Sequence, residues 1–298
     1  MSETKTNWLG LYLAVGIIWG GSFLFIALGN QFLPPIGVGF WRLALGGIPL
    51  LAFALLKGRA FPKSRSAWFK IFVVSLCMNS IPSALFAYAE RHVTSAFAGI
   101  MNAATPIATI IMILLVFREE TPSTKVLFGL GVGLAGVLTV LAVWNGFGKN
   151  DPLAVAALVG AVSLYGIGGP FARRYVSPLK LDIQVQVPVQ VLLGAATLAP
   201  FYLAAAPFTA TPTWPAIFGM LALGVLGTGF AYIWYYRLMA IAGSAIANSV
   251  TYLSPVVAVL AGALVLREQV TWNQILGGVI VIFGAAISQG RFDALFRK

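Results

Sequence analysis

Long apolar stretches separated by short polar turns make up almost the whole chain. A membrane-spanning helix needs about 20 mostly apolar residues to cross a hydrocarbon core of ~30 Å. Apolar runs of this length differ from the alternating segments of about ten residues in a transmembrane barrel, so each run predicts a helix. The predicted spans are residues 8–30, 35–56, 67–89, 93–117, 122–144, 152–172, 183–205, 213–236, 241–266 and 270–289.

The second half of this pattern repeats the first. Residues 95–129 recur at 244–278, a displacement of 149 positions, which is half of the 298-residue chain. The matching elements are Ser95-Ala96-x-Ala98 with Ser244-Ala245-x-Ala247, Leu115-Val116-x-Arg118-Glu119 with Leu264-Val265-x-Arg267-Glu268, Pro106 with Pro255, and Gly129 with Gly278. Each half holds five predicted spans, an odd number, so the second half enters the membrane from the opposite side. The sequence therefore predicts an all-α integral membrane protein with ten transmembrane helices, built as two inverted five-helix repeats (residues 1–148 and 149–298) in a single membrane domain.

Composition and charge support a membrane location. Hydrophobic residues make up 59% of the chain and charged residues 9%, against about 25% charged residues in a soluble domain. The formal net charge of +11 would suit a nucleic-acid partner, but the basic residues are not clustered as a binding groove requires. Most fall in loops that share one side of the membrane, with Arg91, Lys149 and Arg267 on the other. This positive-inside bias predicts cytoplasmic N- and C-termini, with the lipid bilayer and no nucleic acid as a partner.

Inverted repeats are typical of carriers. Two halves related by an axis in the membrane plane can pack in two alternative ways, open to opposite sides, with a ligand held between them near the midplane. Both halves are present in one chain, so a monomer is expected to work alone. The alternative is that duplication simply builds a helical bundle.

Enzyme chemistry has no support in the sequence. There is no G-x-x-x-x-G-K-[ST] phosphate-binding motif, and all three aspartates fall in predicted loops or in the tail. The sole histidine, His92, lies in a loop, which leaves Ser22 without a general base. The single Cys77 permits neither a disulfide within the chain nor a multi-cysteine metal site. We therefore predict that the protein is not an enzyme and holds no cofactor and no metal.

Polar side chains at mid-membrane depth are costly unless they serve a purpose, and they are the candidates for a substrate site. Span 3 carries Asn79 and Ser80, and span 4 carries Asn102 and Thr105. Under the 149-position displacement, polar positions recur as polar positions. The candidates in the second half are Thr228, Asn248, Thr251 and Tyr252. The alternative role for all of them is to hydrogen-bond neighbouring helices, at about 0.6 kcal/mol each.

Arg42 is the one clear cation inside a predicted span. It could hold a substrate carboxylate, or its long stem could carry the charge to water at the span end. Pro106 and Pro255 fall inside spans 4 and 9, where each is expected to remove a backbone donor in mid-helix. Such breaks predict gating bends, with static kinks as the alternative. Gly129-x-x-x-Gly133 in span 5 predicts close helix packing.

Acidic residues gather at span ends. Glu90-Arg91-His92 predicts a solvated turn between spans 3 and 4, and the pairs Arg118-Glu119 and Arg267-Glu268 predict caps that fix helix ends. A proton-driven carrier usually has a carboxylate within the membrane. Only Glu90 comes near that position, at a span end, so proton coupling has no support from the sequence alone.

Several of these residues together resemble a known family. Trp19-Gly20-Gly21-Ser22 in span 1, Phe40-Trp41-Arg42 in span 2 and the twin proline-to-Arg-Glu segments of spans 4 and 9 resemble the EamA-like branch of the drug/metabolite transporter superfamily, over essentially the whole chain. More narrowly, the chain resembles bacterial inner-membrane amino-acid exporters of the YddG type. The resemblance implies that spans 1–4 and 6–9 surround a central cavity and that spans 5 and 10 buttress it. It adds Trp19, Ser22 and Tyr165 to the candidate substrate-binding residues.

The expected function is export of aromatic and other neutral amino acids and related metabolites from the bacterial cytoplasm. A zwitterionic or neutral, partly apolar solute suits the amide, hydroxyl and aromatic candidates, and the scarcity of charged contacts predicts broad selectivity. An exporter of drugs or of another small metabolite is the alternative within the superfamily. A membrane channel or sensor is the alternative from a different class.

Overall fold

Apolar helices dominate the computed structural model, which describes residues 8–113, 115, 124–142, 144, 150–205, 208–242 and 249–288 and shows no strand among them. Seven helical runs are long and apolar enough to cross a membrane: Trp8–Gly29, Pro35–Leu56, Arg65–Ala89, Ser95–Met112, Pro152–Leu179, Ile183–Ala204 and Trp214–Leu238. Shorter apolar helices cover Leu127–Val140, Ser254–Val265 and Trp272–Gly284. The chain is thus an all-helical integral membrane protein in the part described. Seven predicted spans have a helix of membrane-crossing length, and the total of ten stays a prediction.

The element bounds in the two halves correspond. The first half contains α1 (Trp8–Gly29), α2 (Pro35–Leu56), α3 (Arg65–Ser75), the π-helix η1 (Leu76–Ser80), α4 (Ile81–Ala89), α5 (Ser95–Asn102), α6 (Thr105–Met112) and α7 (Thr124–Val140). The second contains α8 (Pro152–Phe171), η4 (Ala172–Val176), η5 (Ser177–Leu179), α9 (Ile183–Ala204), α10 (Trp214–Leu221), the π-helix η6 (Ala222–Phe230), α11 (Ala231–Ala242), η7 (Ser249–Tyr252), α13 (Ser254–Val265) and α14 (Trp272–Ser288). Displaced by 149 positions, the start of α3 at Arg65 falls on the start of α10 at Trp214, and η1 falls within η6.

Local sequence sets where several helices begin. Ser64 accepts a hydrogen bond from the Ala67 N–H at 3.1 Å and caps α3. Thr94 does the same for α5, and Asp151 caps α8 through the Leu153 N–H at 2.7 Å. Side-chain oxygens at these positions satisfy backbone donors that have no partner inside the helix.

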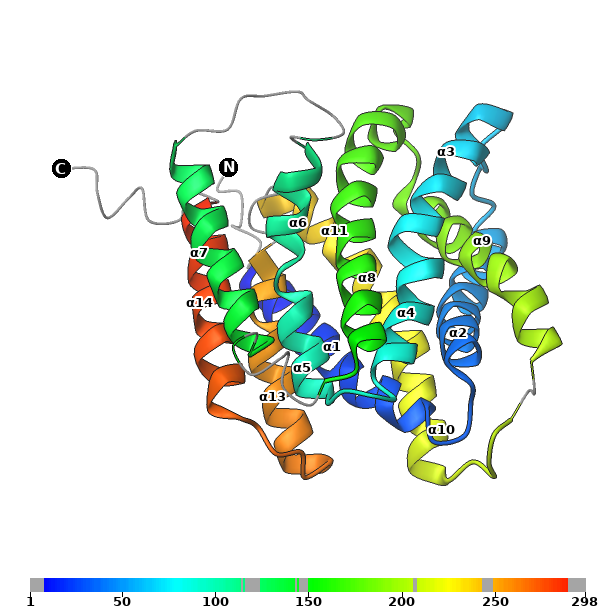
Figure 1. Cartoon of the computed structure of the whole chain (residues 1–298). Helices are drawn as coiled ribbons and strands as arrows, with labels where there is room; N and C mark the ends of the chain where they lie inside the picture. Colours follow the sequence, from blue (N-terminus) through cyan, green and yellow to red (C-terminus); the bar gives the residue numbers. More distant parts are fainter. Residues whose placement is uncertain are drawn as a thin grey trace.

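Glycines bring α7 and α14 together at one edge of the molecule (Figure 1). A Cβ on Gly136 would lie 2.6 Å from the backbone N of Val281, and one on Gly284 would lie 2.8 Å from the carbonyl O of Gly129 and still closer to Gly133. Only glycine permits this approach of two backbones. The close packing predicted for Gly129-x-x-x-Gly133 is therefore confirmed.

The largest apolar core lies among α1, α4, α5 and α8. It contains Phe23 of α1, Phe86 of α4, Phe97 of α5 and Leu158 of α8, all of which are buried. Many large apolar side chains elsewhere are exposed; Leu203, for example, is 80% exposed. Such exposure suits a surface that faces lipid.

Candidate functional site

Trp19 and Ser22, both on α1, meet the π-helix η6. The Trp19 Nε1–H donates a hydrogen bond to the Gly227 carbonyl at 3.1 Å. The Ser22 hydroxyl donates to the Ile18 carbonyl at 2.9 Å, and a Cβ on Gly227 would lie 2.9 Å from the Ser22 Oγ. Single-turn π-helices occur frequently at functional sites because they displace the regular helix bonding. The structure therefore brings these two predicted residues to one point on η6.

Arg42 of α2 also contacts η6, at the next residue. Its Nε donates to the Thr228 hydroxyl at 3.0 Å, and that hydroxyl donates to the Leu223 carbonyl at 3.1 Å. A Cβ on Gly46 would lie 2.9 Å from the Thr228 Cβ, so α2 and η6 approach each other closely. Among the residues described, Arg42 has no ion-pair partner.

The charge on Arg42 acts on groups from three other parts of the fold. It interacts electrostatically with Tyr165 of α8, Tyr232 of α11 and Glu90 at the end of α4. Tyr165 also stacks on Phe86, with ring centroids 6.0 Å apart. The guanidinium thus lies where polar and aromatic groups from both halves of the chain converge.

Tyr232 joins two parts of this arrangement, and the sequence analysis missed it. Its ring meets Trp19 edge-on at 5.8 Å, and its hydroxyl donates to the Met78 carbonyl of η1 at 3.1 Å. That carbonyl needs a donor because Pro82, one turn further on, has no N–H to give. Tyr232 lies four residues after Thr228 and therefore on the same helix face, which is the signal that could have identified it.

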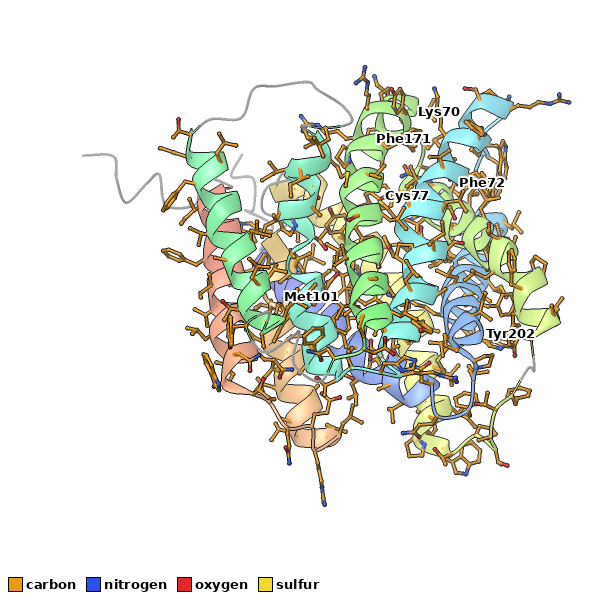
Figure 2. All side chains as sticks on the ribbon, viewed as in Figure 1. Lys70, Phe72, Cys77, Met101, Phe171 and Tyr202 are labelled. Carbon is orange, nitrogen blue, oxygen red and sulfur yellow. The ribbon has the colours of Figure 1, made fainter. Side chains whose placement is uncertain are left out.

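A second polar group lies at η1. The Gln190 Nε2 of α9 donates to the Asn79 Oδ1 at 2.7 Å, and each of these residues is only 1% exposed. The Asn79 Nδ2 and the Ser80 Oγ are buried with no hydrogen-bond partner in the part of the chain described. Gln190 was absent from the predicted candidates. Figure 2 shows Cys77 of η1 and Met101 of α5 between the two ends of the bundle.

Spans 4 and 9 are broken at their prolines, as predicted, but each proline lies in the first turn of the following helix and not in mid-helix. The helix breaks before each proline, at Ala103-Ala104 and at Leu253, and Pro106 and Pro255 lie in the first turn of α6 and α13. A helix start leaves its first N–H groups without intrahelical partners, so a proline costs little there. The Thr105 hydroxyl donates to the Asn102 carbonyl at 2.7 Å, the group that Pro106 leaves without a backbone donor. The gating role of both prolines stays a prediction.

The remaining candidates are only partly described. Thr251 is half-buried in the short helix η7. Asn248 lies outside the described residues, as does the side chain of Tyr252. The candidates thus form a central group on η6, a buried amide group on η1, and the break between α5 and α6.

The turn after α4 is not fully solvated, which corrects the prediction for Glu90. Glu90 is only 9% exposed, and the Ser95 hydroxyl donates to its Oε2 at 3.2 Å. Arg91 and His92 are exposed, as expected. Burial raises the pKa of the Glu90 carboxyl; the Ser95 bond lowers it, the nearby Glu268 raises it and Arg42 lowers it.

Glu268 caps a helix other than its own. Its Oε1 accepts from the Ser95 N–H at 2.8 Å and its Oε2 accepts from the Ala96 N–H at 3.1 Å, at the start of α5. Glu268 therefore caps a helix end, as predicted, but that end is the start of α5 and not the end of its own span. Arg118-Glu119 lies outside the described residues.

The described residues contain no group of three or more His, Cys, Asp or Glu side chains placed to hold a metal ion. Asp151 and Asp182 instead cap α8 and α9. Asp182 also pairs with Arg59 at 3.1 Å on the surface.

Comparison with known proteins gives a consistent result. The model of the EamA-like transporter family matches residues 6–142 and again residues 152–289. YedA of Escherichia coli K12, named an uncharacterized inner membrane transporter, is 29% identical over 291 residues, which cover 95% of this chain and 91% of that protein. YoaV of Bacillus subtilis, named an uncharacterized transporter, is 26% identical over 94% of this chain and 96% of its own. A solved crystal structure superposes with a TM-score of 0.67 over 97% of this chain and 99% of the other, at 17% identity, and shows the same fold.

Proposed function

The chain belongs to the EamA-like transporter family, and we propose that it is a multi-pass inner-membrane exporter of aromatic and other neutral amino acids. The family and the names of YedA and YoaV support a transporter rather than an enzyme. The inner-membrane location is supported by the name of YedA and by the seven apolar helices of membrane-crossing length. The substrate is argued from the residues around Arg42.

The observation that carries the proposal is that Arg42, inside a helix of membrane-crossing length, has no ion-pair partner among the described residues. A guanidinium within a membrane-spanning helix is costly unless an anion or several acceptors receive its hydrogen bonds. The Thr228 hydroxyl accepts the Nε–H hydrogen bond at 3.0 Å. The described residues supply no ion-pair partner for the remaining N–H groups of the guanidinium. A guanidinium binds a carboxylate through two parallel hydrogen bonds. We infer that the carboxylate of the substrate binds the free edge of the Arg42 guanidinium.

Aromatic residues beside Arg42 favour a substrate with an apolar side chain. Tyr165 and Tyr232 interact electrostatically with the guanidinium, and the Trp19 ring packs edge-on against Tyr232. Aromatic pairs stabilise each other by about 0.5–1.5 kcal/mol beyond the area they bury. A single cation selects a single carboxylate, whereas side chains of different shape can lie against the rings. This arrangement supports broad selectivity among aromatic and other neutral amino acids.

The proposed mechanism is alternating access through a central cavity between two inverted repeats, carried out by one chain. Two hydrogen bonds support it, because each links a π-helix of one half to the second helix of the other: Arg42 with Thr228, and Gln190 with Asn79. Bonds of this kind can form or break as the halves rock against each other. The cytoplasmic placement of both termini belongs to the same proposal.

The direct test is exchange of labelled amino acids in proteoliposomes. We expect the wild-type protein to exchange external labelled phenylalanine for internal unlabelled phenylalanine, and Arg42→Gln to reduce this exchange at least tenfold. Arg59→Gln is the matched control, because it removes a surface arginine that pairs with Asp182. Equal exchange in Arg42→Gln and wild type would overturn the assignment of the carboxylate site.

The rival functions predict different results in the same vesicles. An exporter of cationic drugs or of another metabolite would be inhibited by those compounds and not by amino acids. A channel would conduct current in a planar bilayer without exchange. Competition by a panel of amino acids, with no single-channel current, is the outcome that supports the proposal.

A further inference from the structure

Two carboxylates converge on one residue at the start of α5. Ser95 uses its backbone N–H to bond the Glu268 Oε1 at 2.8 Å and its hydroxyl to bond the Glu90 Oε2 at 3.2 Å. Ser95 itself is 2% exposed. Glu268 follows α13 and Glu90 follows α4, so this cluster ties three helix ends together at the lower end of the molecule in Figure 1.

The two carboxylates differ in their partners. Glu268 places both oxygens on backbone donors, the N–H groups of Ser95 and Ala96, which stabilises its ionised form. The Glu90 Oε1 is buried and has no hydrogen-bond partner in the described protein. A buried carboxylate oxygen without a donor favours a bound proton, since the free-energy cost of moving the neutral acid out of water is far smaller than that of the ionised form.

Charged groups on the neighbouring elements act on Glu90 in opposite senses. Arg42 of α2 attracts a negative charge on Glu90, and Glu268 repels it. On the α1 side, the Phe23 carbonyl oxygen lies 3.4 Å from the Ser95 hydroxyl oxygen and shares its single hydrogen with Glu90. Arg91 donates to the Leu33 carbonyl at 2.8 Å, and His92 pairs with Asp151 at 3.5 Å, so the neighbouring turn residues are directed to other partners.

We propose that Glu90 is a proton-binding residue, and that the proton on Glu90 holds the start of α5 closed against Glu268. The proton comes from water and is taken up by the Glu90 carboxylate, which becomes a neutral acid. When the proton returns to water, a second negative charge appears beside Glu268. Two like charges that share one hydrogen-bonding residue repel each other, and α5 is released from the segment after α13.

The direction of the pH dependence follows from the environment of Glu90. Burial is the largest cause that raises the pKa of this carboxyl, and Glu268 adds to it; the Ser95 bond and Arg42 act in the opposite sense. A glutamate with a raised pKa in the closed state stabilises that state at low pH, and the stabilisation is lost as the pH rises through the raised value. The closed arrangement is therefore favoured at lower pH.

The first experiment does not depend on transport. Infrared difference spectra of the purified protein during a pH titration detect the C=O stretch of a protonated carboxylic acid. We expect a band that titrates above the usual range for glutamate in the wild type and is absent in Glu90→Gln. Asp182→Asn is the matched control and should keep the band. A wild-type spectrum without the band, or a band that survives in Glu90→Gln, would overturn the proton site.

A second variant keeps the test decisive if Glu90→Gln fails to fold. Ser95→Ala removes the hydroxyl that stabilises the ionised Glu90, so the band should titrate at a higher pH than in the wild type. An unchanged midpoint in Ser95→Ala contradicts the proposal. Loss of the band in Glu268→Gln, but not in Glu90→Gln, would show that the proton is bound by Glu268. That result would also overturn the proposal.

The consequence for transport rests on the proposed function. Because substrate exchange needs the start of α5 to open, exchange of phenylalanine at equal pH on both sides should accelerate severalfold with rising pH. Glu90→Gln imitates the protonated acid, so its exchange should be slow and independent of pH. If the wild type exchanges no amino acid while the infrared band behaves as expected, the amino-acid function fails and the proton site stands. If exchange is normal but the band is missing, the reverse holds.

Discussion

The Arg42 Nε lies 3.0 Å from the Thr228 hydroxyl oxygen, in a hydrogen bond that joins α2 of the first half to η6 of the second. A quasi-equivalent bond joins Gln190 of α9 to Asn79 of η1 at 2.7 Å. Asn79 and Thr228 are related by the 149-position displacement, and their two donors differ by one position under the same displacement. The duplicated sequence therefore gives two similar contacts between the halves, one of them charged.

The charged contact predicts a selective effect of Thr228. Replacing Thr228 with Val removes the acceptor of the Arg42 Nε bond, and hydrogen bonds to charged groups contribute about 1.5–3 kcal/mol. We expect phenylalanine binding, measured by isothermal titration calorimetry in detergent, to weaken about tenfold or more because the guanidinium loses its orientation. Thr228→Ser keeps the hydroxyl and should bind nearly as the wild type does. Equal weakening in both variants would mean that the side-chain volume matters and the bond does not.

The neutral contact predicts an effect on stability. Gln190→Leu leaves the Asn79 amide buried without its partner, which costs about 1–3 kcal/mol. The double variant Asn79→Leu/Gln190→Leu removes both polar groups and should be destabilised by less than the sum of the two single changes. Thermal unfolding of all four proteins in one detergent measures the coupling. Additive changes in stability would show that the two amides act independently.

The α7–α14 contact permits a matched pair of glycine substitutions. A Cβ on Gly277 would lie 2.6 Å from the Val140 backbone N and 2.8 Å from the Gly136 carbonyl O. Both are backbone atoms, which cannot move aside as the end of a flexible side chain can. Overpacking of this kind typically costs about 1–3 kcal/mol, so Gly277→Ala should lower the unfolding temperature. Gly131 on the same helix pair has open space around its Cα. Gly131→Ala should therefore leave the stability equal or raise it slightly, since alanine favours helix more than glycine does.

Several features of the fold and site followed from the sequence because they depend on local pattern. The apolar runs located the helices, and the displacement that pairs Asn79 with Thr228 found polar residues on the π-helices η1 and η6. Arg42 was recognised as a cation inside a span, and the glycines of α7 were recognised as a packing surface. Each of these predictions needed only residue type and spacing.

Other features depend on contacts between distant segments, which spacing does not contain. Gln190 is one of three glutamines in α9, and its spacing does not distinguish it from Gln184 and Gln186; only the position of α9 beside η1 shows its partner. Glu90 lies in a polar turn by sequence, yet the start of α5 and the segment after α13 bury it. The position of Pro106 in the first turn of α6 depends on the break at Ala103-Ala104, and neither alanine predicts a break.

The Glu268 cap predicts a local change at α5. Glu268→Ala removes the acceptor for the Ser95 and Ala96 N–H groups, and loss of a helix cap typically costs about 0.5–2 kcal/mol. We expect faster hydrogen exchange in peptides that cover the first turn of α5, measured by mass spectrometry. Peptides from α9, which is capped by Asp182, should be unchanged. Uniformly faster exchange would instead indicate a global loss of stability.

The break between α5 and α6 predicts a kinetic effect of its proline. Pro106→Ala supplies an N–H that can donate to the Asn102 carbonyl in place of the Thr105 hydroxyl, which now bonds it at 2.7 Å. The two short helices would then join into one stiffer helix, because the missing bond and the ring clash are both removed. If bending at this break opens the site, phenylalanine exchange in proteoliposomes should slow severalfold while the affinity for phenylalanine stays the same. Pro200→Ala, within the continuous helix α9, is the control for removing a proline as such. Equal exchange rates in Pro106→Ala, Pro200→Ala and the wild type would leave Pro106 with a static role.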